Sequence, residues 1–322
     1  MSELVTLADI EDARTRCKEV FFRTPMVPFL PDPVPQARRL LLKAESLQPT
    51  GAFKLRGAFN KIALSLPQAR EHGIVAHSSG NHARAVAWIA RSLDLKAVIV
   101  MPDTTPDAKV AATLALGAEV VIVTPDERDT RAFELAAEYG YVPIPPYDDA
   151  SIIAGQGIVG LEIIEDAPDV STVLVPVSGG GLIAGISTAI KSVSPHVKVI
   201  GVEPFFAADA RESFKTGVRT KWEASQTYRT IADGLRTTCV GELPWRQIQE
   251  YVDDIITVSE DEIRESVRRL ALQARLVAEP SGAVAAAAYF HHSGDLAEGT
   301  TVAVVSGGNV DPTLFVDIIS HG

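Results

Sequence analysis

The segment SLQPTGAFKLRGAF, residues 46–59, places an amine where it could act as a nucleophile. Lys54 follows a Pro-Thr-Gly turn at 49–51 that predicts the start of a helix, and its immediate neighbours are apolar. Desolvation, together with the nearby cations Arg56 and Lys61, would lower its pKa below about 10.4, so that a neutral amine could attack a carbonyl. The alternative is a surface lysine whose stem packs on its neighbours while its amine reaches water.

A carbonyl cofactor held by such an amine would carry a phosphate, and VLVPVSGGGLIAGI contains a turn that could bind one. Between a predicted strand and a predicted helix stand Ser178, Gly179, Gly180 and Gly181. Successive glycines let the backbone approach an anion closely, and the helix adds the positive end of its dipole. The loop lacks the Gly-Lys-Ser/Thr of a Walker A motif and matches the GxGxxG spacing only loosely. A monophosphate site is therefore favoured, and a nucleotide-binding enzyme is the rival interpretation.

Two further stretches place polar residues where a predicted strand ends. At the head of a helix, VAHSSGNHARAV provides Ser78, Ser79, Asn81 and His82, with Asn81 as the predicted N-cap. Their hydroxyl, amide and N–H groups suit a carboxylate or a phenolic oxygen, although capping alone would also explain them. In VAVVSGGNVDPTLF, Ser306 follows a buried strand, either within a tight turn or as a hydroxyl that faces a ring nitrogen.

The elements that must position these residues alternate between short apolar strands and longer helices. Runs of Val and Ile separated by helices predict parallel sheets that are covered on both faces. The predicted fold class is α/β, with two open, mainly parallel twisted sheets, and ligands bind beyond the carboxyl ends of the strands in such sheets. We expect residues 1–71 and 149–322 to form a large domain and residues 72–148 a small one, which agrees with a length of 322 residues.

Composition excludes several classes of protein. Hydrophobic residues make up 46% and charged residues 22% of the chain, as in a compact globular protein. The net charge of −11 argues against nucleic acid or an anionic membrane as a partner. No apolar run in the sequence reaches the ~18 residues of a membrane span. Cys17 and Cys239 are too few and too far apart for a disulfide framework or a zinc site, so we expect a cytoplasmic protein.

Together these stretches resemble the pyridoxal-phosphate-dependent serine/threonine dehydratase and serine racemase family, which has the tryptophan-synthase-β-like fold. The resemblance covers nearly the whole chain and is carried, in order, by RTPMV, PTGAFKLRGA, SSGNHA, DDASIIAGQGIVGLEI, VPVSGGGLIAGI, GVEP, TIADGL, VDDIITVSEDEI, AEPSGAV and SGGNVDPT. It implies a cofactor in the cleft between the large and the small domain. It also implies a homodimer.

The resemblance implies that Lys54 holds pyridoxal phosphate as a Schiff base. The residues that would contact the rest of the cofactor are Phe53 beside the ring, Asn81 at the phenolic oxygen, Ser306 at the pyridine nitrogen, and Ser178, Gly179, Gly180 and Gly181 around the phosphate. A neutral serine at the pyridine nitrogen cannot keep a proton there as an aspartate would, so less negative charge is drawn from the substrate into the ring. Expulsion of a β-hydroxyl then competes well with transamination.

The same resemblance implies a set of substrate-binding residues, namely Ser78, Ser79, Asn81 and His82 with Thr237 opposite, and Arg128. Lys54 would take the α proton on one face of the substrate. Ser79 matches the second acid/base of serine racemases, although a structural or substrate-binding hydroxyl explains it equally well. Arg128 roughly matches an arginine that meets a second carboxylate, as in 3-hydroxyaspartate, and an exposed arginine at a helix start is the commoner explanation.

A divalent cation site is also implied, in GVEPFFAADA. Glu203 and Asp209 would supply carboxylates and Ala207 its carbonyl, with waters completing the coordination. Hard oxygen ligands select magnesium or calcium, with manganese as a further candidate.

The predicted function is pyridoxal-phosphate-dependent β-elimination from β-hydroxy amino acids, in which L-threonine or L-serine yields a 2-oxo acid and ammonia. The alternatives within the same family are a serine racemase and a 3-hydroxyaspartate dehydratase. An alternative of another class is a cofactor-free, anion-binding regulatory module on the same scaffold. That module is disfavoured because both Lys54 and the glycine-rich loop are present.

Overall fold

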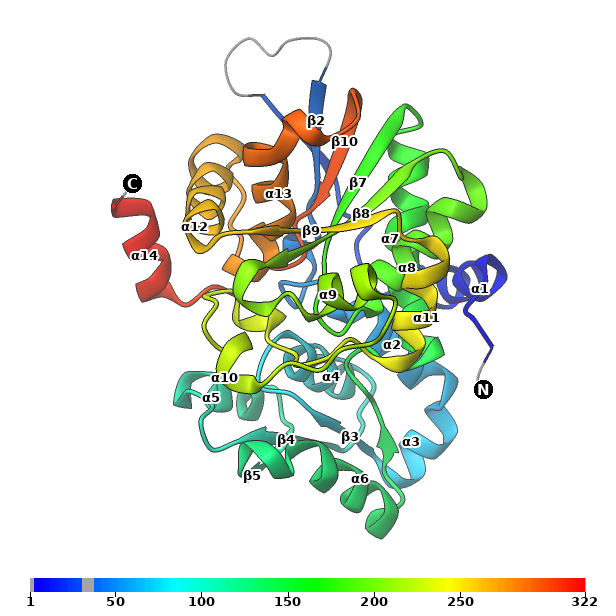
Figure 1. The fold of residues 1–322 in the computed structure, drawn as a ribbon. Helices are drawn as coiled ribbons and strands as arrows, with labels where there is room; N and C mark the ends of the chain where they lie inside the picture. Colours follow the sequence, from blue (N-terminus) through cyan, green and yellow to red (C-terminus); the bar gives the residue numbers. More distant parts are fainter. Residues whose placement is uncertain (1–2, 31–37, 322) are drawn as a thin grey trace.

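The computed structural model describes residues 3–30 and 38–321 and contains two β-sheets with helices packed on their faces (Figure 1). One sheet has six strands in the order β1-β2-β10-β7-β8-β9, and the other has four strands in the order β5-β4-β3-β6. Strand β1 pairs with β2 antiparallel, and the other pairings among the described strands are parallel. This architecture confirms the predicted α/β class. The domain boundaries after residues 71 and 148 stay a prediction.

The C-terminal strand lies inside the larger sheet, between β2 and β7. The six-stranded sheet consists of β1 (Met26–Phe29), β2 (Arg38–Lys43), β10 (Gly299–Val304), β7 (Val170–Pro176), β8 (Lys198–Pro204) and β9 (Asp254–Val258). The four-stranded sheet consists of β5 (Glu119–Val123), β4 (Ala97–Pro102), β3 (Ile74–His77) and β6 (Val142–Pro143).

Helices cover both sheets, and most of them follow a strand directly. The α-helices are α1 (Leu7–Cys17), α2 (Lys54–Leu64), α3 (Leu66–His72), α4 (Asn81–Ser92), α5 (Asp107–Ala115), α6 (Arg128–Tyr139), α7 (Ala150–Asp166), α8 (Gly181–Val193), α9 (Asp209–Thr216), α10 (Ala224–Thr227), α11 (Glu242–Tyr251), α12 (Glu260–Arg269), α13 (Pro280–His292) and α14 (Pro312–Ser320). The short turns of 3-10 helix are η1 (Glu45–Leu47), η2 (Pro125–Glu127), η3 (Phe205–Ala207), η4 (Asp233–Leu235) and η6 (Ser293–Asp295), and η5 (Leu270–Ala274) is a π-helical turn. In the two described ranges, no helix combines the length and the apolar composition needed to span a membrane.

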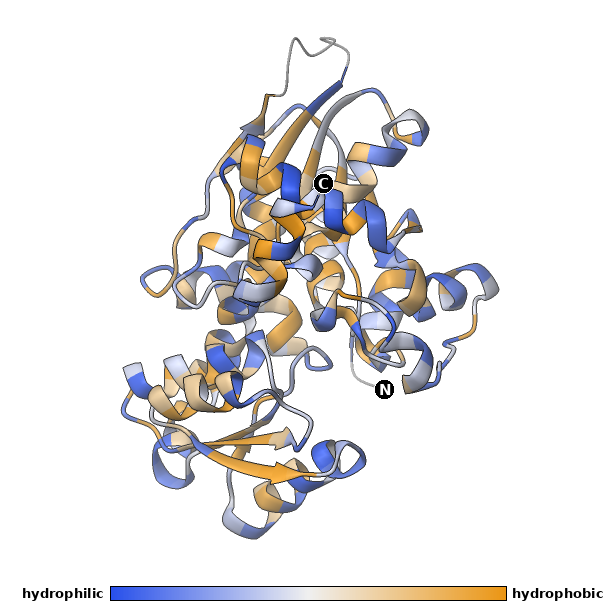
Figure 2. Ribbon diagram, turned by 90° about the vertical axis from the view of Figure 1, so that its left-hand side faces the viewer, coloured by the Kyte–Doolittle hydropathy of each residue, from blue (hydrophilic) through white to orange (hydrophobic). Residues whose placement is uncertain are grey.

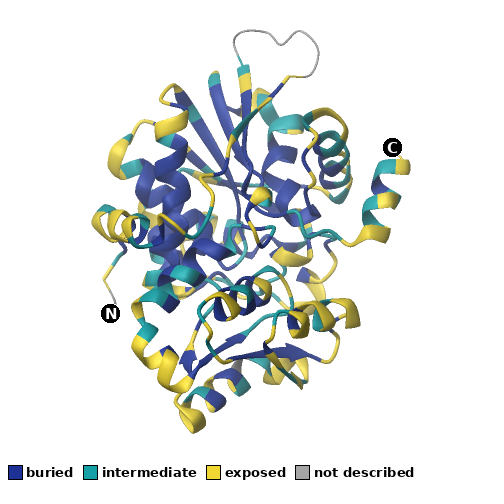
Figure 3. Ribbon diagram, turned by 180° about the vertical axis from the view of Figure 1, so that it is seen from behind, coloured by how far each residue is buried: buried dark blue, intermediate teal, exposed yellow. Residues whose placement is uncertain are grey.

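Apolar residues of the strands are buried between these helices, as Figures 2 and 3 show for both sheets. On one face of the six-stranded sheet, the side chains of α7, α8 and α11 pack against β7 and β8. The other face is covered by α12 and α13. The smaller sheet packs against α4 on one face and α6 on the other. Strands buried on both faces are apolar without alternation, which is why the Val- and Ile-rich runs were the clearest signal in the sequence.

Two predicted elements differ from the structure. The sequence pattern over 259–275 is typical of one continuous helix, but α12 ends at Arg269 and the π-turn η5 follows, closed by Arg275 in the left-handed conformation at φ 59°. The predicted strand YVPIP is reduced to the two residues of β6. Val142 and Ile144 donate to the carbonyls of Gly73 and Val75 at 3.0 and 2.8 Å, while Pro143 and Pro145 have no N–H to donate on the other side, which suits an edge strand.

A cluster of four charged residues is buried beside the helix that begins at Lys54. Arg56 donates from Nε to Glu45 at 2.8 Å and from Nη1 to Glu162 at 2.7 Å, and the Nζ of Lys43 lies 2.6 Å from Glu162. The four side chains are at most 6% exposed. Burial disfavours the charged form of Glu45, but the charges of Arg56 and Lys43 outweigh burial and lower the pKa of this carboxyl. The cluster thus joins β2, η1, α2 and α7 without a net formal charge.

Replacing Arg56 by alanine should lower the free energy of unfolding by about 3–5 kcal/mol, because two buried carboxylates lose their main partner. Arg39→Ala is the matched control. Arg39 is 56% exposed and its partner Asp169 lies 3.8 Å away, so its loss should cost less than about 1 kcal/mol. Urea unfolding followed by circular dichroism measures both variants. Equal losses would contradict a structural role for the buried cluster.

Candidate active site

The loop before Lys54 is paired by backbone hydrogen bonds to the loop that follows β10. The N–H of Phe53 donates to the carbonyl of Ser306 at 3.0 Å, and the N–H of Gly308 donates to the carbonyl of Gly51 at 2.9 Å. Gly51 has φ 76°, a conformation that favours glycine, and a Cβ there would lie 2.4 Å from the side chain of Asn309. The structure therefore brings Phe53, Lys54 and Ser306 together, although they stand far apart in the sequence.

The amine of Lys54 is sheltered, as the apolar neighbours in the sequence predicted. Its Nζ donates to the carbonyl of Pro146 at 2.6 Å and lies 5.0 Å from the centroid of the Phe53 ring. Desolvation by burial lowers its pKa to about 8. The nearby cations contribute no part of this shift, which corrects the expectation for Arg56 and Lys61. Arg56 belongs to the buried cluster, and Lys61 pairs at 2.7 Å with the carboxylate that caps α7.

The glycine-rich loop forms the start of α8. Gly180 has φ 87°, and Gly181 is the first helical residue. The first N–H groups of a helix have no acceptor within it, so this loop presents donors at the positive end of the helix dipole. The Oγ of Ser178 lies 2.7 Å from the Oγ1 of Thr237, and the N–H of Thr237 also donates to Ser178 Oγ at 3.3 Å. Thr237 therefore contacts the glycine-rich loop. Its predicted place opposite the loop at 78–82, across a bound substrate, stays a prediction.

The segment at 146–147 connects the amine and the glycine-rich loop. Pro146 accepts the hydrogen bond from Lys54, and the next residue, Tyr147, packs on the loop. A Cβ at Gly179 would lie 2.3 Å from the Tyr147 ring, and one at Gly181 would lie 3.0 Å from its Cβ. The loop therefore has no space for side chains at these positions. Two consecutive residues, Pro146 and Tyr147, thus contact the amine and the glycine-rich loop respectively.

Asn81 is not the N-cap of its helix, contrary to the expectation from the sequence. Gly80 occupies the cap position, and Asn81 is the first residue of α4. Its Nδ2 donates to Glu279 Oε1 at 2.5 Å, and its Oδ1 accepts a hydrogen bond from Asn309 Nδ2 at 2.8 Å. The cap prediction is wrong because these tertiary partners outcompete local capping and fix the amide. The second hydrogen on Nδ2 remains available for a ligand.

Glu279 and Asn309 are functional candidates that the sequence did not reveal. The carboxyl of Glu279 is 5% exposed, and burial, followed by the negative charge of Asp233, raises its pKa to about 7. A Cβ at Gly307 would lie 2.2 Å from its Oε1, so the carboxyl reaches the loop that follows Ser306. Glu279 lies in the motif AEPSGAV, but nothing in that motif indicates a contact with a residue 198 positions away.

The serine-rich loop after β3 lies at the carboxyl end of the strand, as predicted. Ser78 and Ser79 are half-buried, and Ser78 Oγ accepts a hydrogen bond from the N–H of Gly80 at 3.2 Å. His82 is 2% exposed, with its Nε2 2.8 Å from the carbonyl of Ile144. Burial, and then the charge of Lys54, lowers the pKa of His82 to about 3. This ring is therefore neutral, and its Nε2 carries the proton because the partner is a carbonyl.

Arg128 begins α6, directly beyond β5 and its following turn. Because β5 and β3 are parallel members of one sheet with β4 between them, Arg128 lies at the same sheet edge as the serine-rich loop. It stands two strands away from Ser79. Its contact with a substrate stays a prediction.

The carboxylates predicted to bind a cation lie together at the end of β8. Glu203 accepts hydrogen bonds from the N–H groups of Ala210 at 3.1 Å and Arg211 at 2.7 Å. Asp209 is 1% exposed, and its Oδ2 is buried without a hydrogen-bond partner among the described residues. Burial raises the pKa of Asp209 to about 7, and burial together with the charge of Asp209 raises that of Glu203. In the described part of the chain, no group of three or more His, Cys, Asp or Glu residues could hold a metal ion. Carbonyls such as that of Ala207, and water, would have to complete the coordination.

Comparison with known proteins identifies the family. The sequence model described as pyridoxal-phosphate dependent enzyme matches residues 18–307. A catabolic L-threonine dehydratase of Staphylococcus aureus (strain USA300) is 40% identical over 328 aligned residues, which cover 100% of this chain and 94% of the relative. An L-threonine ammonia-lyase of Thermotoga maritima is 40% identical over 321 residues, covering 99% of this chain and 79% of the relative.

Solved structures have the same fold. A threonine deaminase from T.th. superposes with a TM-score of 0.89 at 43% identity, covering 95% of this chain and 99% of that one. Maize serine racemase superposes with a TM-score of 0.89 at 32% identity, covering 99% of this chain and 98% of that one. An α/β fold with a sheltered amine beside a glycine-rich helix start is typical of an enzyme that holds a phosphorylated carbonyl cofactor. The chain belongs to the pyridoxal-phosphate dependent enzyme family.

The residues at the site fit this cofactor. The glycine-rich loop offers backbone donors to a phosphate, and the adjacent residues Pro146 and Tyr147 contact the amine of Lys54 and this loop respectively. The amide of Asn81 is oriented with one hydrogen available. Ser306 is 4% exposed and pairs through its carbonyl with the residue before Lys54. The structure therefore assembles in one place an amine, an anion cradle and two polar side chains.

The lowered pKa of Lys54 predicts how its reactivity depends on pH. In cofactor-free protein, the rate of labelling by trinitrobenzenesulfonate at Lys54 should rise with pH and level off above an inflection near 8, since only the neutral amine reacts. Solvent-exposed lysines should inflect near the reference value of about 10.4. Mass mapping of the peptides gives each rate separately. An inflection at Lys54 equal to that of exposed lysines would contradict a sheltered amine.

Proposed function

We propose that this protein is a pyridoxal-phosphate-dependent dehydratase that converts L-threonine and L-serine to the 2-oxo acid and ammonia. One observation carries the proposal: Pro146 accepts a hydrogen bond from the sheltered amine of Lys54, and the adjacent Tyr147 packs on the glycine-rich helix start. The chain's relatives are named L-threonine dehydratase and L-threonine ammonia-lyase. A cofactor-free regulatory module would have no use for an amine with a pKa of about 8.

Lys54 would act as the base. When bound, pyridoxal phosphate stabilises negative charge at the α carbon of an amino acid. With a pKa of about 8, the Nζ of Lys54 is neutral in an appreciable fraction of molecules near neutral pH, so it can accept the α proton. The carbonyl of Pro146 at 2.6 Å holds the amine on one side of the site. The neutral hydroxyl of Ser306 opposite would favour elimination over transamination.

The cofactor would be oriented by groups that are already fixed. The N–H groups at the start of α8 would hold the phosphate, with the hydroxyls of Ser178 and Thr237 beside them. Asn81 would meet the phenolic oxygen with its free amide hydrogen. The carboxyl of Glu279 accepts a hydrogen bond from the same amide group and so orients it, which makes Glu279 a positioning residue.

The substrate would lie against the loop after β3. Its α-carboxylate would be bound by hydroxyls and N–H groups in the region of Ser78, Ser79, Asn81 and His82. The half-buried Ser79 could hold or supply a proton at Oγ on the face opposite Lys54, which keeps serine racemase as the second candidate function. Arg128, at the same sheet edge, keeps 3-hydroxyaspartate among the substrates to be tested.

A divalent cation is a further part of the proposal, with Mg²⁺, Ca²⁺ or Mn²⁺ bound by Glu203, Asp209 and the carbonyl of Ala207. The unpartnered, buried Oδ2 of Asp209 supports it. A homodimer is proposed from the resemblance alone. Two free cysteines, Cys17 and Cys239, fit a reducing compartment and support a cytoplasmic location.

The cofactor-saturated enzyme should form 2-oxo acid from L-threonine and L-serine, measured by coupling to a dehydrogenase. Lys54→Ala should reduce the rate by at least about a thousandfold, because the base is lost. Ser79→Ala should leave elimination from L-serine largely intact while suppressing any racemisation, which chiral chromatography of the remaining serine detects. Both forms of 3-hydroxyaspartate complete the panel. If none of these substrates yields a 2-oxo acid, the proposed function is wrong.

Mg²⁺ or Ca²⁺ should raise the melting temperature by several degrees, since saturation at a hundred times Kd adds about 2.7 kcal/mol. In chelator, stability should fall as pH rises from about 4 to 7, because the folded carboxyls of raised pKa bind more protons than the unfolded ones. Asp209→Asn should flatten that slope and abolish the response to the cation. Glu250→Gln, at an exposed acid, is the control and should change neither. An unchanged cation response in Asp209→Asn would place the cation elsewhere.

A further inference from the structure

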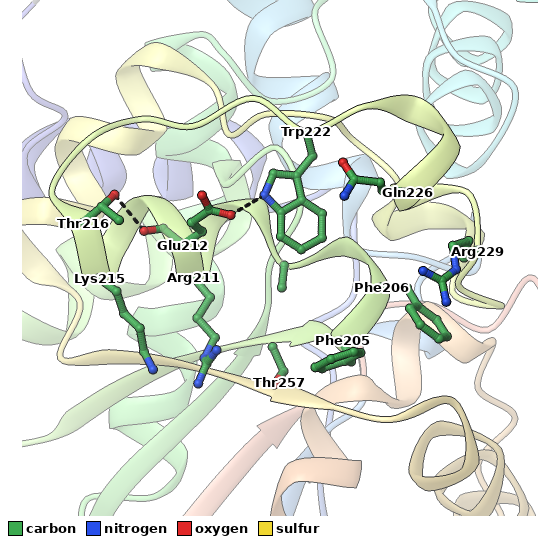
Figure 4. Close-up of a pocket in the computed structure, with 11 residues that line it drawn as sticks. Phe205, Phe206, Arg211, Glu212, Lys215, Thr216, Trp222, Gln226, Arg229 and Thr257 are labelled. Atoms are coloured by element: carbon green, nitrogen blue, oxygen red, sulfur yellow. Dashed lines mark hydrogen bonds between the residues drawn. The ribbon is translucent and has the colours of Figure 1, made fainter.

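A cavity lies on the larger sheet, beside the carboxyl end of β8, and it shares no residue with the site around Lys54 (Figure 4). Its volume of about 500 Å³ is in the range of small-molecule sites. Its walls come from η3, α9, α10 with the flanking loop, and one residue of β9, Thr257. Nothing in the proposed dehydratase chemistry uses this cavity.

Three cationic side chains line the cavity: Arg211, Lys215 and Arg229. In the described part of the chain, none of them has a carboxylate within 4.0 Å. The one acid in the lining, Glu212, accepts a hydrogen bond from the Nε1 of Trp222 at 2.6 Å. Unpaired cations concentrated in this way are notable in a chain with 41 acidic and 30 basic residues. The cavity is therefore suited to an anion.

Two of the cations repel each other, which lowers the stability of the helix that carries them. Arg211 and Lys215 lie one turn apart on α9, and Figure 4 shows their charged ends side by side. Like charges at this spacing destabilise a helix unless an anion lies between them. The charge of Arg211 also favours the ionised form of Glu203. This effect is smaller than that of burial, so the pKa of Glu203 is still raised. Lys215 has no such second role. Arg229 lies 3.9 Å from the centroid of the Phe206 ring, which orients its guanidinium.

Aromatic rings form the rest of the wall. The indole of Trp222 is fixed by its bond to Glu212, and its backbone N–H donates to the carbonyl of Thr238 at 2.7 Å. In Figure 4, Trp222 and Phe205 approach the cavity from opposite sides. Phe205 is 62% exposed, so its ring is covered by water although it borders a concave site. A flat ring placed between the two would remove this apolar surface from water.

We propose that this cavity binds a small organic anion, with its carboxylate or phosphate at Arg211 and Lys215 and a flat ring between Trp222 and Phe205. The site is separate from the proposed catalytic site and its occupancy does not require turnover. The cavity is connected to the glycine-rich loop through the backbone. Its lining residue Trp222 bonds to Thr238, and the preceding residue, Thr237, contacts Ser178.

The test titrates the cofactor-loaded enzyme with phenyl phosphate and with benzoate, which distinguish the two kinds of anionic group. Binding is followed by calorimetry and by tryptophan fluorescence. At least one probe should bind saturably, and Lys215→Gln should weaken it about five- to tenfold. Lys221→Gln, at an exposed lysine outside the lining, is the matched control and should leave the affinity unchanged. Trp222→Phe should abolish the fluorescence change while calorimetry still detects binding, because Trp88 and Trp245 lie elsewhere.

Several results would overturn the proposal. If neither probe binds, or if Lys215→Gln binds as tightly as the unmodified enzyme, the cavity is not the proposed anion site. Equal binding of benzylamine would show that charge is not recognised. If inorganic phosphate binds as tightly as phenyl phosphate, the aromatic rings contribute nothing, and the ring-binding part of the proposal is wrong.

Discussion

The candidate active site depends on one backbone pairing, between the loop before α2 and the loop after β10. Hydrogen bonds from Phe53 to Ser306 and from Gly308 to Gly51 set the point and direction at which α2 begins. The first residue of that helix is Lys54. If these loops separated, the amine would lose its fixed position relative to Ser306. The chemistry of the site thus rests on main-chain contacts between the first and the last parts of the chain.

Partners from distant parts of the chain hold the polar side chains around this pairing. Asn81 is oriented by Glu279 and Asn309, and Arg56 is oriented by two carboxylates. A buried polar group that loses its partner costs about 1–3 kcal/mol. Any shift of α2 or α4 would break several such contacts together. These hydrogen bonds and ion pairs therefore restrict the site to one arrangement.

Local pattern accounts for what the sequence could predict. Parallel strands that are buried on both faces have an apolar signature of their own, and a glycine-rich turn between strand and helix has only a few structural solutions. Long-range contacts have no such signature. The cap expected at Asn81 was wrong because its amide bonds to Glu279, 198 positions away. The lowered pKa of Lys54 was predicted correctly in direction and in its main cause, desolvation. The expected contribution of Arg56 and Lys61 was wrong, because the carboxylates that pair with them could not be seen in the sequence.

The insertion of β10 between β2 and β7 has a consequence for synthesis on the ribosome. All four strands of the smaller sheet lie within residues 74–143, so that sheet can form while the chain is still being made. The larger sheet cannot close until Gly299–Val304 has left the exit tunnel. Until then β2 and β7 expose unpaired edges that invite aggregation. The loop that pairs with the segment before Lys54 follows β10, so the site around Lys54 can assemble only after β10 has been made, and a chain that lacks β10 would leave these edges exposed to chaperones.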